Sequence, residues 1–225
     1  MFGRIARRYD LTNRVLSMGI DVYWRFCLVG AVRKHNPKEI LDLATGSGDV
    51  AFALKRGLKP ETSVLGVDFC LPMIEEAENK RAAHDGPFSG LEFRQGDALA
   101  LALPDSSFDV VTIAFGFRNM EDRSLCLAEI RRVLRPAGWL FILEFSKPWR
   151  FLRPLYDFHL RHIVPSIAGK LTGDRSAYDY LCGSIAAFPD RNALSVEIRA
   201  AGFEEVSSDP LTTGIVAIHS ARRPA

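Results

Sequence analysis

A turn with two glycines and flanking aspartates is the first place in the sequence where chemistry could occur. Thr45-Gly46-Ser47-Gly48-Asp49 follows a short apolar run that contains Asp42. Two glycines one residue apart allow a tight turn and let a ligand approach bare backbone. Asp68 ends the next apolar run, 20 residues after Gly48, where a carboxylate can accept both hydroxyls of a ribose. The spacing therefore predicts a site for a ligand that contains a nucleoside.

Charge separates two classes of ligand for this turn. With Ala51, the turn satisfies the relaxed G-x-G-x-x-A pattern of dinucleotide-binding proteins, whose pyrophosphate rests on free N–H groups at a helix start. We expect Asp49 to cap that helix start, with Asp42 nearby, and a carboxylate about 4 Å from a phosphate costs roughly 4 kcal/mol at an effective dielectric constant of about 20. The same carboxylates would favour a ligand with an ammonium and a sulfonium, such as S-adenosylmethionine. A nicotinamide-dependent oxidoreductase and a simple N-cap role for Asp49 stay open as alternatives.

A third aspartate follows the third apolar run, in Gly96-Asp97-Ala98. Taken alone, a Gly-Asp pair is typical of an ordinary turn. Asp42, Asp68 and Asp97, however, all fall at the carboxyl ends of consecutive predicted strands. In an open parallel sheet ligands bind beyond these ends, so we expect Asp97 to accept a hydrogen bond from an adenine amino group.

The segment after the fourth apolar run indicates the class of acceptor. It reads Ala114-Phe115-Gly116-Phe117-Arg118-Asn119 and lacks the Asn/Asp-Pro-Pro-aromatic turn typical of enzymes that methylate amino nitrogens. Two phenylalanines and one cation are suited to an aromatic or lipid-like acceptor that becomes anionic. The alternative is that Arg118 only pairs with Glu121 or Asp122 at the start of the next helix.

Short apolar runs alternate with helical segments over residues 39–148. Each run is rich in Val, Ile, Leu or Phe and is bounded by Gly, Pro or Asp. This alternation predicts right-handed crossovers and a doubly wound, mostly parallel sheet of the α/β class. The predicted strands are 39–44, 63–67, 91–95, 108–114 and 138–145; the helices are 49–56, 72–83 and 123–134, the last with Leu125, Ala128, Ile130 and Leu134 on its apolar face.

Helical segments are expected before and after this core. Residues 5–32 predict an N-terminal helical region, and 203–208 and 214–221 predict a closing pair of strands. Between them, helices are predicted at 152–168, 177–188 and 191–201, the last starting at Pro189-Asp190. We expect one domain over 1–225, with an N-terminal helical cap (1–36), a cofactor-binding core (37–148), a helical insert forming a lid (149–201) and closing strands (202–225).

Composition excludes several classes of protein. The 225 residues are 48% hydrophobic and 25% charged, which excludes a disordered or coiled-coil chain. Lys and Arg number 29 against 27 Asp and Glu, too balanced for a dedicated nucleic-acid binder. The four cysteines form no C-x-x-C pair, and His159 and His162 have no further ligand residues close by, so reduced thiols and no metal are expected. No run of 18 apolar residues occurs, and we expect a soluble, cytoplasmic protein.

Several motifs together resemble the ubiquinone/menaquinone biosynthesis C-methyltransferase family over essentially the whole chain. Residues 9–13 (YDLTN) and Trp24 resemble the family's first signature, with Asp21 in place of the usual histidine. Residues 132–138 (RVLRPAG) through 144–146 (EFS) resemble the second, with Arg and Ala where Lys and Gly are more usual. Further similar stretches are Leu16-Ser17, 115–119 (FGFRN), 178–181 (YDYL), Ser184-Ile185 and Phe188-Pro189.

The resemblance implies a seven-stranded class I S-adenosylmethionine-dependent methyltransferase fold and C-methylation of a prenylated quinol ring. The preferred acceptor is demethylmenaquinol, which would become menaquinol; a polyprenyl benzoquinol of ubiquinone biosynthesis is the alternative. By position, the family's cofactor contacts fall on Gly46 and Ser47, on Asp68, and on Asp97 and Ala98. A serine often found at the end of the fourth strand is alanine here.

The resemblance also assigns three residues to the acceptor. Tyr9, Asn13 and Arg118 are the implied substrate-binding positions. The acceptor would have to be the reduced quinol and not the quinone, because loss of a proton from a quinol hydroxyl makes the neighbouring ring carbon nucleophilic. Arg118 stays protonated under ordinary conditions, so we expect it to be the catalytic residue that stabilises the phenolate.

A membrane-embedded substrate raises the question of membrane contact. Residues 150–170 mix apolar and basic side chains, which is typical of a helix at an anionic membrane surface, and a lid buried against the sheet is the alternative. The sequence leaves open a peripheral location at the inner face of the membrane, a homodimer, a binding module without activity, and another small-molecule methyltransferase.

Overall fold

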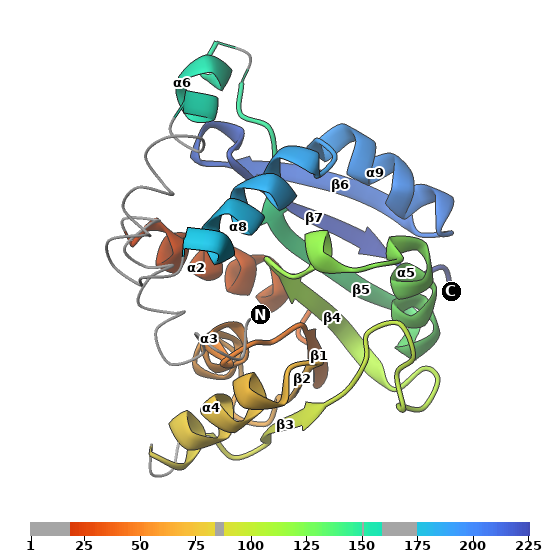
Figure 1. Cartoon of the computed structure of the whole chain (residues 1–225). Helices are drawn as coiled ribbons and strands as arrows, with labels where there is room; N and C mark the ends of the chain where they lie inside the picture. Colours follow the sequence, from red (N-terminus) through yellow and green to blue (C-terminus); the bar gives the residue numbers. More distant parts are fainter. Residues whose placement is uncertain (1–18, 84–87, 150, 159–174) are drawn as a thin grey trace.

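In the computed structural model of the chain, the described residues are 19–83, 88–149, 151–158 and 175–225. They form a twisted sheet of seven strands with helices on both faces (Figure 1). The strands are β1 (Glu39–Leu43), β2 (Ser63–Asp68), β3 (Leu91–Gln95), β4 (Phe108–Ala114), β5 (Leu134–Phe145), β6 (Glu204–Leu211) and β7 (Val216–Arg222).

The strand order is β3-β2-β1-β4-β5-β7-β6. Strands β1 to β5 are parallel, whereas β7 runs antiparallel to both of its neighbours, β5 and β6. The chain runs outward from β1 to β3 and then returns to place β4 on the other side of β1. The strand order therefore reverses between β1 and β4, and this is the point at which open α/β sheets bind ligands. The expected doubly wound, seven-stranded fold is confirmed.

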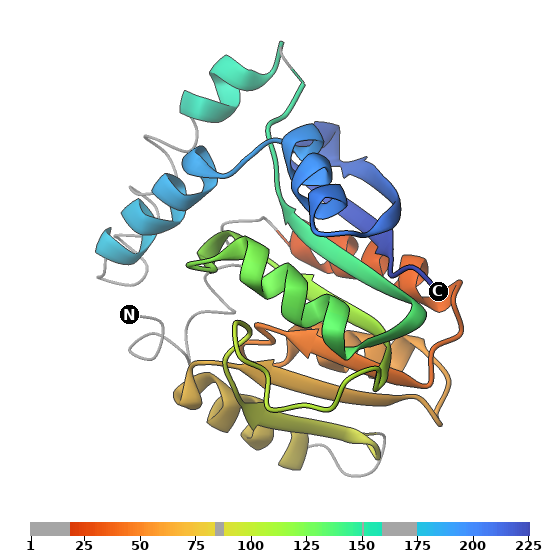
Figure 2. The ribbon, with the colours of Figure 1, turned by 90° about the vertical axis from the view of Figure 1, so that its right-hand side faces the viewer.

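Two apolar layers attach the helices to the sheet. Helices α2 (Ile20–Arg33), α3 (Asp49–Gly57) and α4 (Leu71–Ala82) contribute to one buried cluster, and α5 (Arg123–Val133) and α9 (Arg191–Ala200) to the other. Figure 2 shows α5 and α9 in front of the sheet and α2 behind it. Because both faces are covered, the central strands carry apolar residues at nearly every position.

The segment that follows β5 contains two further helices, α6 (Arg153–Phe158) and α8 (Arg175–Ala187). Helix α6 stands apart from the sheet in both ribbon views (Figures 1 and 2). The rest of the helix expected over 152–168, and residues 5–18 of the expected N-terminal helical region, lie outside the described residues. Asp190 caps α9 by accepting from the backbone N–H groups of Asn192 and Ala193, as the Pro189-Asp190 start predicts.

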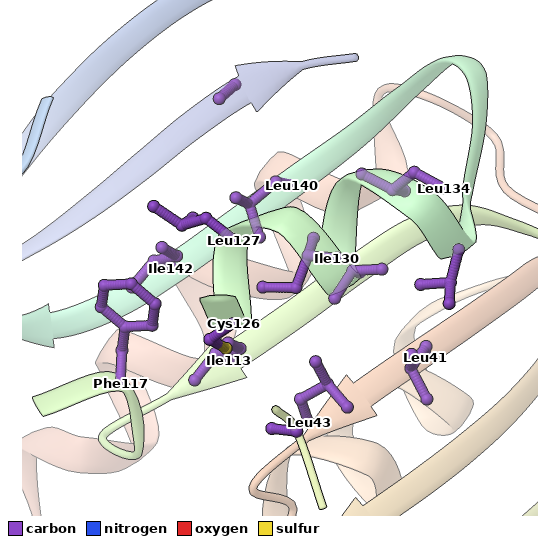
Figure 3. Packing of buried hydrophobic residues seen from close by; sticks show 14 of the residues in the cluster. Leu41, Leu43, Ile113, Phe117, Cys126, Leu127, Ile130, Leu134, Leu140 and Ile142 are labelled. Atoms are coloured by element: carbon purple, nitrogen blue, oxygen red, sulfur yellow. The ribbon is translucent and has the colours of Figure 1, made fainter. Parts of the chain in front are cut away.

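The apolar face predicted for α5 was partly wrong. Ile130 is fully buried, but Leu125 is 46% exposed and Ala128 is also exposed. The buried face consists instead of Cys126, Leu127, Ile130 and Val133, which pack against β1, β4 and β5 (Figure 3). The predicted face was read from 125, 128, 130 and 134, and Leu134 proves to be the first residue of β5.

The two versions of this face predict opposite results for two leucines. We expect Leu127→Ala to lower the free energy of unfolding by about 2–5 kcal/mol, because Leu127 is 1% exposed and its removal leaves a cavity. Leu125→Ala should cost less than about 0.5 kcal/mol. Chemical denaturation of both variants measures the difference, and a larger loss for Leu125→Ala would contradict the packing described above.

Candidate active site

The buried carboxyl of Asp42 ties the glycine turn to the sheet. Asp42 lies in β1, opposite Thr112 of β4, and is 1% exposed. Its Oδ1 accepts from the Thr112 hydroxyl and its Oδ2 from the Thr45 hydroxyl, both at 2.6 Å. Burial raises the pKa of Asp42 to about 6, although both hydrogen bonds oppose the rise; the charge of Asp68 adds to it. The turn is thus fixed to both central strands by one acid.

The turn itself exposes bare backbone at Gly46. Gly46 has a φ of 57°, in the left-handed region that favours glycine, and a Cβ built on it would meet no atom within 4 Å. Its backbone N–H donates to Asp68 Oδ2 at 2.8 Å. Open space beside an unsubstituted backbone is what a ligand requires for close approach. Ser47, the neighbouring predicted cofactor contact, is 4% exposed.

Asp68 and Asp97 lie at the ends of the neighbouring strands β2 and β3. Asp68 Oδ1 accepts from the Cys70 backbone N–H at 2.8 Å, and burial raises the pKa of Asp68 against its two backbone hydrogen bonds. The Gly96 N–H donates to the Asp68 carbonyl at 3.0 Å, which places the turn of Asp97 and Ala98 beside Asp68. Asp97 is exposed and Ala98 is 8% exposed. A carboxylate has about four acceptor sites, so Asp68 can still accept from a ribose.

The role predicted for Asp49 was wrong. The N-cap of α3 is Gly48, and no side chain caps this helix. Asp49 is instead paired with Lys80 Nζ at 3.1 Å and with Arg25 at 3.6 Å, so its charge is compensated. The negative charge near the turn therefore comes mainly from the carboxyls of Asp42 and Asp68. The expected preference of the glycine turn for a cationic ligand over a phosphate depends on these two carboxyls.

Three aromatic rings gather where β4 and β5 end. The ring of Phe115 lies 4.9 Å from that of Phe145 and 5.7 Å from that of Trp24, between centroids. Trp24 comes from α2 and donates from Nε1 to the Thr212 hydroxyl at 2.7 Å. We call Trp24, Phe115 and Phe145 the aromatic group. Phe117, the second phenylalanine of the 115–119 stretch, is fully buried in the core and does not belong to it.

Gly116 lets the ends of β4 and β1 come together. A Cβ at this position would overlap the Cβ of Ala44, the residue that follows β1. Ala44 and Phe115 both have positive φ values, 52° and 56°, which are uncommon for residues with side chains. Backbone strain of this kind concentrates at functional sites, and here it occurs on both sides of the point where the strand order reverses.

Arg118 is buried and paired, but not with either of the residues expected as the alternative. Its Nη1 lies 2.8 Å from Glu144 Oε1 and also donates to the Phe115 carbonyl. Its guanidinium carbon lies 5.2 Å from the centroid of the Phe145 ring. Asp122 caps α5 instead. The sequence assigned no role to Glu144, although a glutamate inside the apolar run 138–145 is an unusual feature.

Helix α8 reaches the same edge of the sheet. The Tyr180 hydroxyl donates to Asn119 Oδ1 at 3.3 Å, next to Arg118 in the chain. The residues expected at the acceptor from the N-terminal motif, Tyr9 and Asn13, lie outside the described residues.

The arrangement is suited to S-adenosylmethionine. Two carboxylates and the exposed Asp97 border a turn with open backbone, and residues 45–48 carry no cation that would bind a pyrophosphate. Within the described ranges, no group of three or more His, Cys, Asp or Glu side chains could hold a metal ion.

The raised pKa of Asp42 predicts a specific dependence of stability on pH. Between its ordinary value of 3.8 and about 6, the native chain holds this proton more tightly than the unfolded chain, so the contribution of Asp42 to stability falls as pH rises. A shift of this size corresponds to roughly 3 kcal/mol. We expect Asp42→Asn to remove this fall, measured by chemical denaturation from pH 4 to pH 8. Asp209→Asn, at an exposed position of β6, is the control, and an unchanged pH profile in Asp42→Asn would contradict the assignment.

Comparison with known proteins identifies the family and relatives of the chain. A family model described as the ubiE/COQ5 methyltransferase family matches residues 1–223. A protein of Thermus thermophilus named demethylmenaquinone methyltransferase is 46% identical over 227 residues, covering 100% of both chains. A protein of Geobacter sulfurreducens named ubiquinone/menaquinone biosynthesis C-methyltransferase is 38% identical, covering 99% of this chain and 87% of its own length.

Solved structures share the fold at low identity. A structure from Thermotoga maritima, described as a SAM-dependent methyltransferase and possible histamine N-methyltransferase, has a TM-score of 0.69 at 20% identity and covers 99% of this chain and 97% of its own. A SAM-dependent methyltransferase from Aquifex aeolicus has a TM-score of 0.60 at 18% identity, covering 83% and 82%. These matches do not favour an oxidoreductase. With its class I methyltransferase fold and a match over nearly every residue, the chain belongs to the ubiE/COQ5 methyltransferase family.

Proposed function

We propose that this chain methylates a ring carbon of a prenylated naphthoquinol, converting demethylmenaquinol to menaquinol with S-adenosylmethionine as the methyl donor. The observation that carries the proposal is the aromatic group beside a buried guanidinium, at the end of β4 and next to the acid-bordered glycine turn. An aromatic ring that becomes anionic is the acceptor to which such a surface is complementary.

The cofactor-binding residues are those that border the glycine turn. Asp68 would accept from the ribose hydroxyls and Asp97 from the adenine amino group, while Gly46 and Ser47 offer backbone and Ala98 an apolar contact. Bound there, S-adenosylmethionine supplies an electrophilic methyl group on a sulfonium. From its place in β1, Asp42 fixes the turn through the Thr45 hydroxyl and adds negative charge near that cation.

The acceptor residues would act by holding the quinol and stabilising its charge. Phe115 and Phe145, the half-buried members of the aromatic group, would contact a flat aromatic acceptor, for which offset or edge-to-face contacts are favourable, while Trp24, 5% exposed, supports them from the core. Arg118 provides a positive charge for the oxygen that loses its proton. Tyr9 and Asn13 complete the proposed substrate contacts. Holding two reactants at attacking distance, in surroundings that exclude water, supplies the larger part of the acceleration in such reactions.

Naphthoquinol is favoured over benzoquinol by the names of the more similar relatives. Proteins of Thermus thermophilus and Deinococcus radiodurans named demethylmenaquinone methyltransferase are 46% and 43% identical, while the Geobacter sulfurreducens protein, whose name includes ubiquinone, is 38% identical.

A direct assay tests the proposed reaction. Purified protein is incubated with S-adenosylmethionine labelled in the methyl group and either reduced demethylmenaquinol or the matching polyprenyl benzoquinol. We expect label in menaquinol, at least about tenfold faster than in the benzoquinol product, and none with oxidised demethylmenaquinone as the control, because the quinone has no ionisable hydroxyl. Transfer to neither quinol would disprove the proposal, and faster transfer to benzoquinol would assign the other acceptor.

We also propose that α6 and the residues before it contact the membrane that holds the substrate. Trp149, Phe151 and Phe158 are 51%, 74% and 55% exposed and form what we call the α6 patch. Lys147 and Arg153 nearby are exposed and cationic. Aromatic and basic side chains together favour the surface of an anionic bilayer. No helix among the described residues is long and apolar enough to cross a membrane.

Vesicle binding tests the α6 patch. Replacing Trp149, Phe151 and Phe158 by Ser should weaken co-sedimentation with anionic phospholipid vesicles by about 100-fold or more, because burying each ring contributes on the order of 1 kcal/mol or more. Val196→Ser, which changes an apolar residue of α9 that is 62% exposed, is the control and should bind like the wild type. Equal binding by all three proteins would rule out the α6 patch as the contact.

A further inference from the structure

Glu144 is an acid in the interior of the protein, at the carboxyl end of β5. Its side chain is 0% exposed, and its neighbours along the strand from 140 to 143 are all buried and apolar. Placing a charged carboxylate in such surroundings is costly unless every oxygen is bound by a donor. The partners of Glu144 therefore indicate what this residue is for.

The hydrogen bonds that Glu144 forms with the described residues lie at the ends of β4 and β5. Oε1 accepts from Arg118 Nη1 and from the Phe145 backbone N–H, both at 2.8 Å. Oε2 accepts from the Arg118 backbone N–H at 3.2 Å. One carboxylate thus binds both the main chain and the guanidinium of Arg118, which restricts where that side chain can lie.

Arg118 retains donor capacity that this pairing does not use. The guanidinium has five N–H donors in a planar fork. Nη1 donates to Glu144 and to the Phe115 carbonyl, whereas the buried Nε has no hydrogen-bond partner among the described residues. A buried donor without a partner costs free energy, and such groups are found where a ligand or a water completes the site. The guanidinium also lies against the ring of Phe145, in the aromatic group.

We infer that Glu144 is the positioning residue for Arg118, holding the guanidinium at the aromatic group so that its remaining donors meet the oxygen of the acceptor as that oxygen becomes negative. The inference rests on the proposed function, because it needs an anionic acceptor. Glu144 itself is fully buried and touches neither substrate nor cofactor; it acts through Arg118. Its charge also balances that of Arg118, so the pair places no uncompensated cation in the protein interior.

Asp109 and Arg135 offer a control pair with the same kinds of partners, although their side chains are 29% and 40% exposed. Asp109, near the amino end of β4, pairs with Arg135 at 2.5 Å and accepts from the backbone N–H groups of Lys38 and Glu39 at 2.8 and 3.0 Å. It has the same kinds of partners as Glu144, but it lies at the amino ends of the strands, opposite the carboxyl ends that border the site. A purely structural acid–arginine pair should behave like Asp109 and Arg135.

The first measurement separates turnover from cofactor binding. We expect Glu144→Gln to lower kcat for demethylmenaquinol by about 100-fold, because small displacements of a catalytic group have effects of this size. Calorimetric affinity for S-adenosylhomocysteine should change less than about twofold, since the glycine turn is untouched. Asp109→Asn should leave kcat within about twofold of the wild type. Equal kcat in Glu144→Gln and wild type would overturn the inference.

The second measurement keeps the test valid if Glu144→Gln does not fold. Arg118→Gln alone leaves a buried, unpaired carboxylate, so Arg118→Gln/Glu144→Gln should unfold at a higher temperature than Arg118→Gln. If Glu144 acts only through Arg118, the kcat of Arg118→Gln/Glu144→Gln should equal that of Arg118→Gln within about threefold, because Glu144 then has no further effect to lose. A double variant that is more than tenfold slower would show that Glu144 acts by another route. Failure of the wild type to methylate any quinol would instead refute the proposed function.

Discussion

The hydrogen bonds of the buried Asp42 carboxyl are the interaction on which the rest of the site depends. They join the glycine turn to β1 and β4, the two strands between which the strand order reverses. A charged group in this position is unfavourable by itself, as its raised pKa shows. The threonine hydroxyls offset part of that cost and fix the turn, so the turn's position follows from the sheet rather than from the loop sequence alone.

The carboxyl ends of the strands border two different electrostatic environments. On the side of β1 and β2, Asp42 accepts from hydroxyls and Asp68 from backbone N–H groups, and neither pairs with an arginine or lysine of the described residues. On the side of β4 and β5, Arg118 and Glu144 neutralise each other beside the aromatic group. The first environment favours a cationic ligand and the second a neutral aromatic ring that gains negative charge. A methyl transfer from a sulfonium to a quinol requires both, next to each other.

The sheet and the positions of the acids at its carboxyl ends could be predicted from the sequence because their signals are local. The β3 and β4 boundaries agree with the apolar runs, and Asp68 and Asp97 follow directly from their places at strand ends. Errors occurred where local pattern was insufficient. The buried face of α5 includes Cys126 and Leu127 instead of the predicted Leu125 and Ala128. Asp49 forms ion pairs with a lysine of α4 and an arginine of α2 and does not cap the helix N-terminus.

By itself, the sequence determined the order of strands and helices, the glycine turn and the family, because periodicity and motif spacing are properties of neighbouring residues. Only the tertiary structure decided which charges meet. Arg118 and Glu144 are 26 residues apart and Trp24 and Phe115 are farther, yet each pair lies in contact where β4 and β5 end. Such contacts depend on how strands align side by side and on which helices cover them, and the packing of the whole sheet sets both.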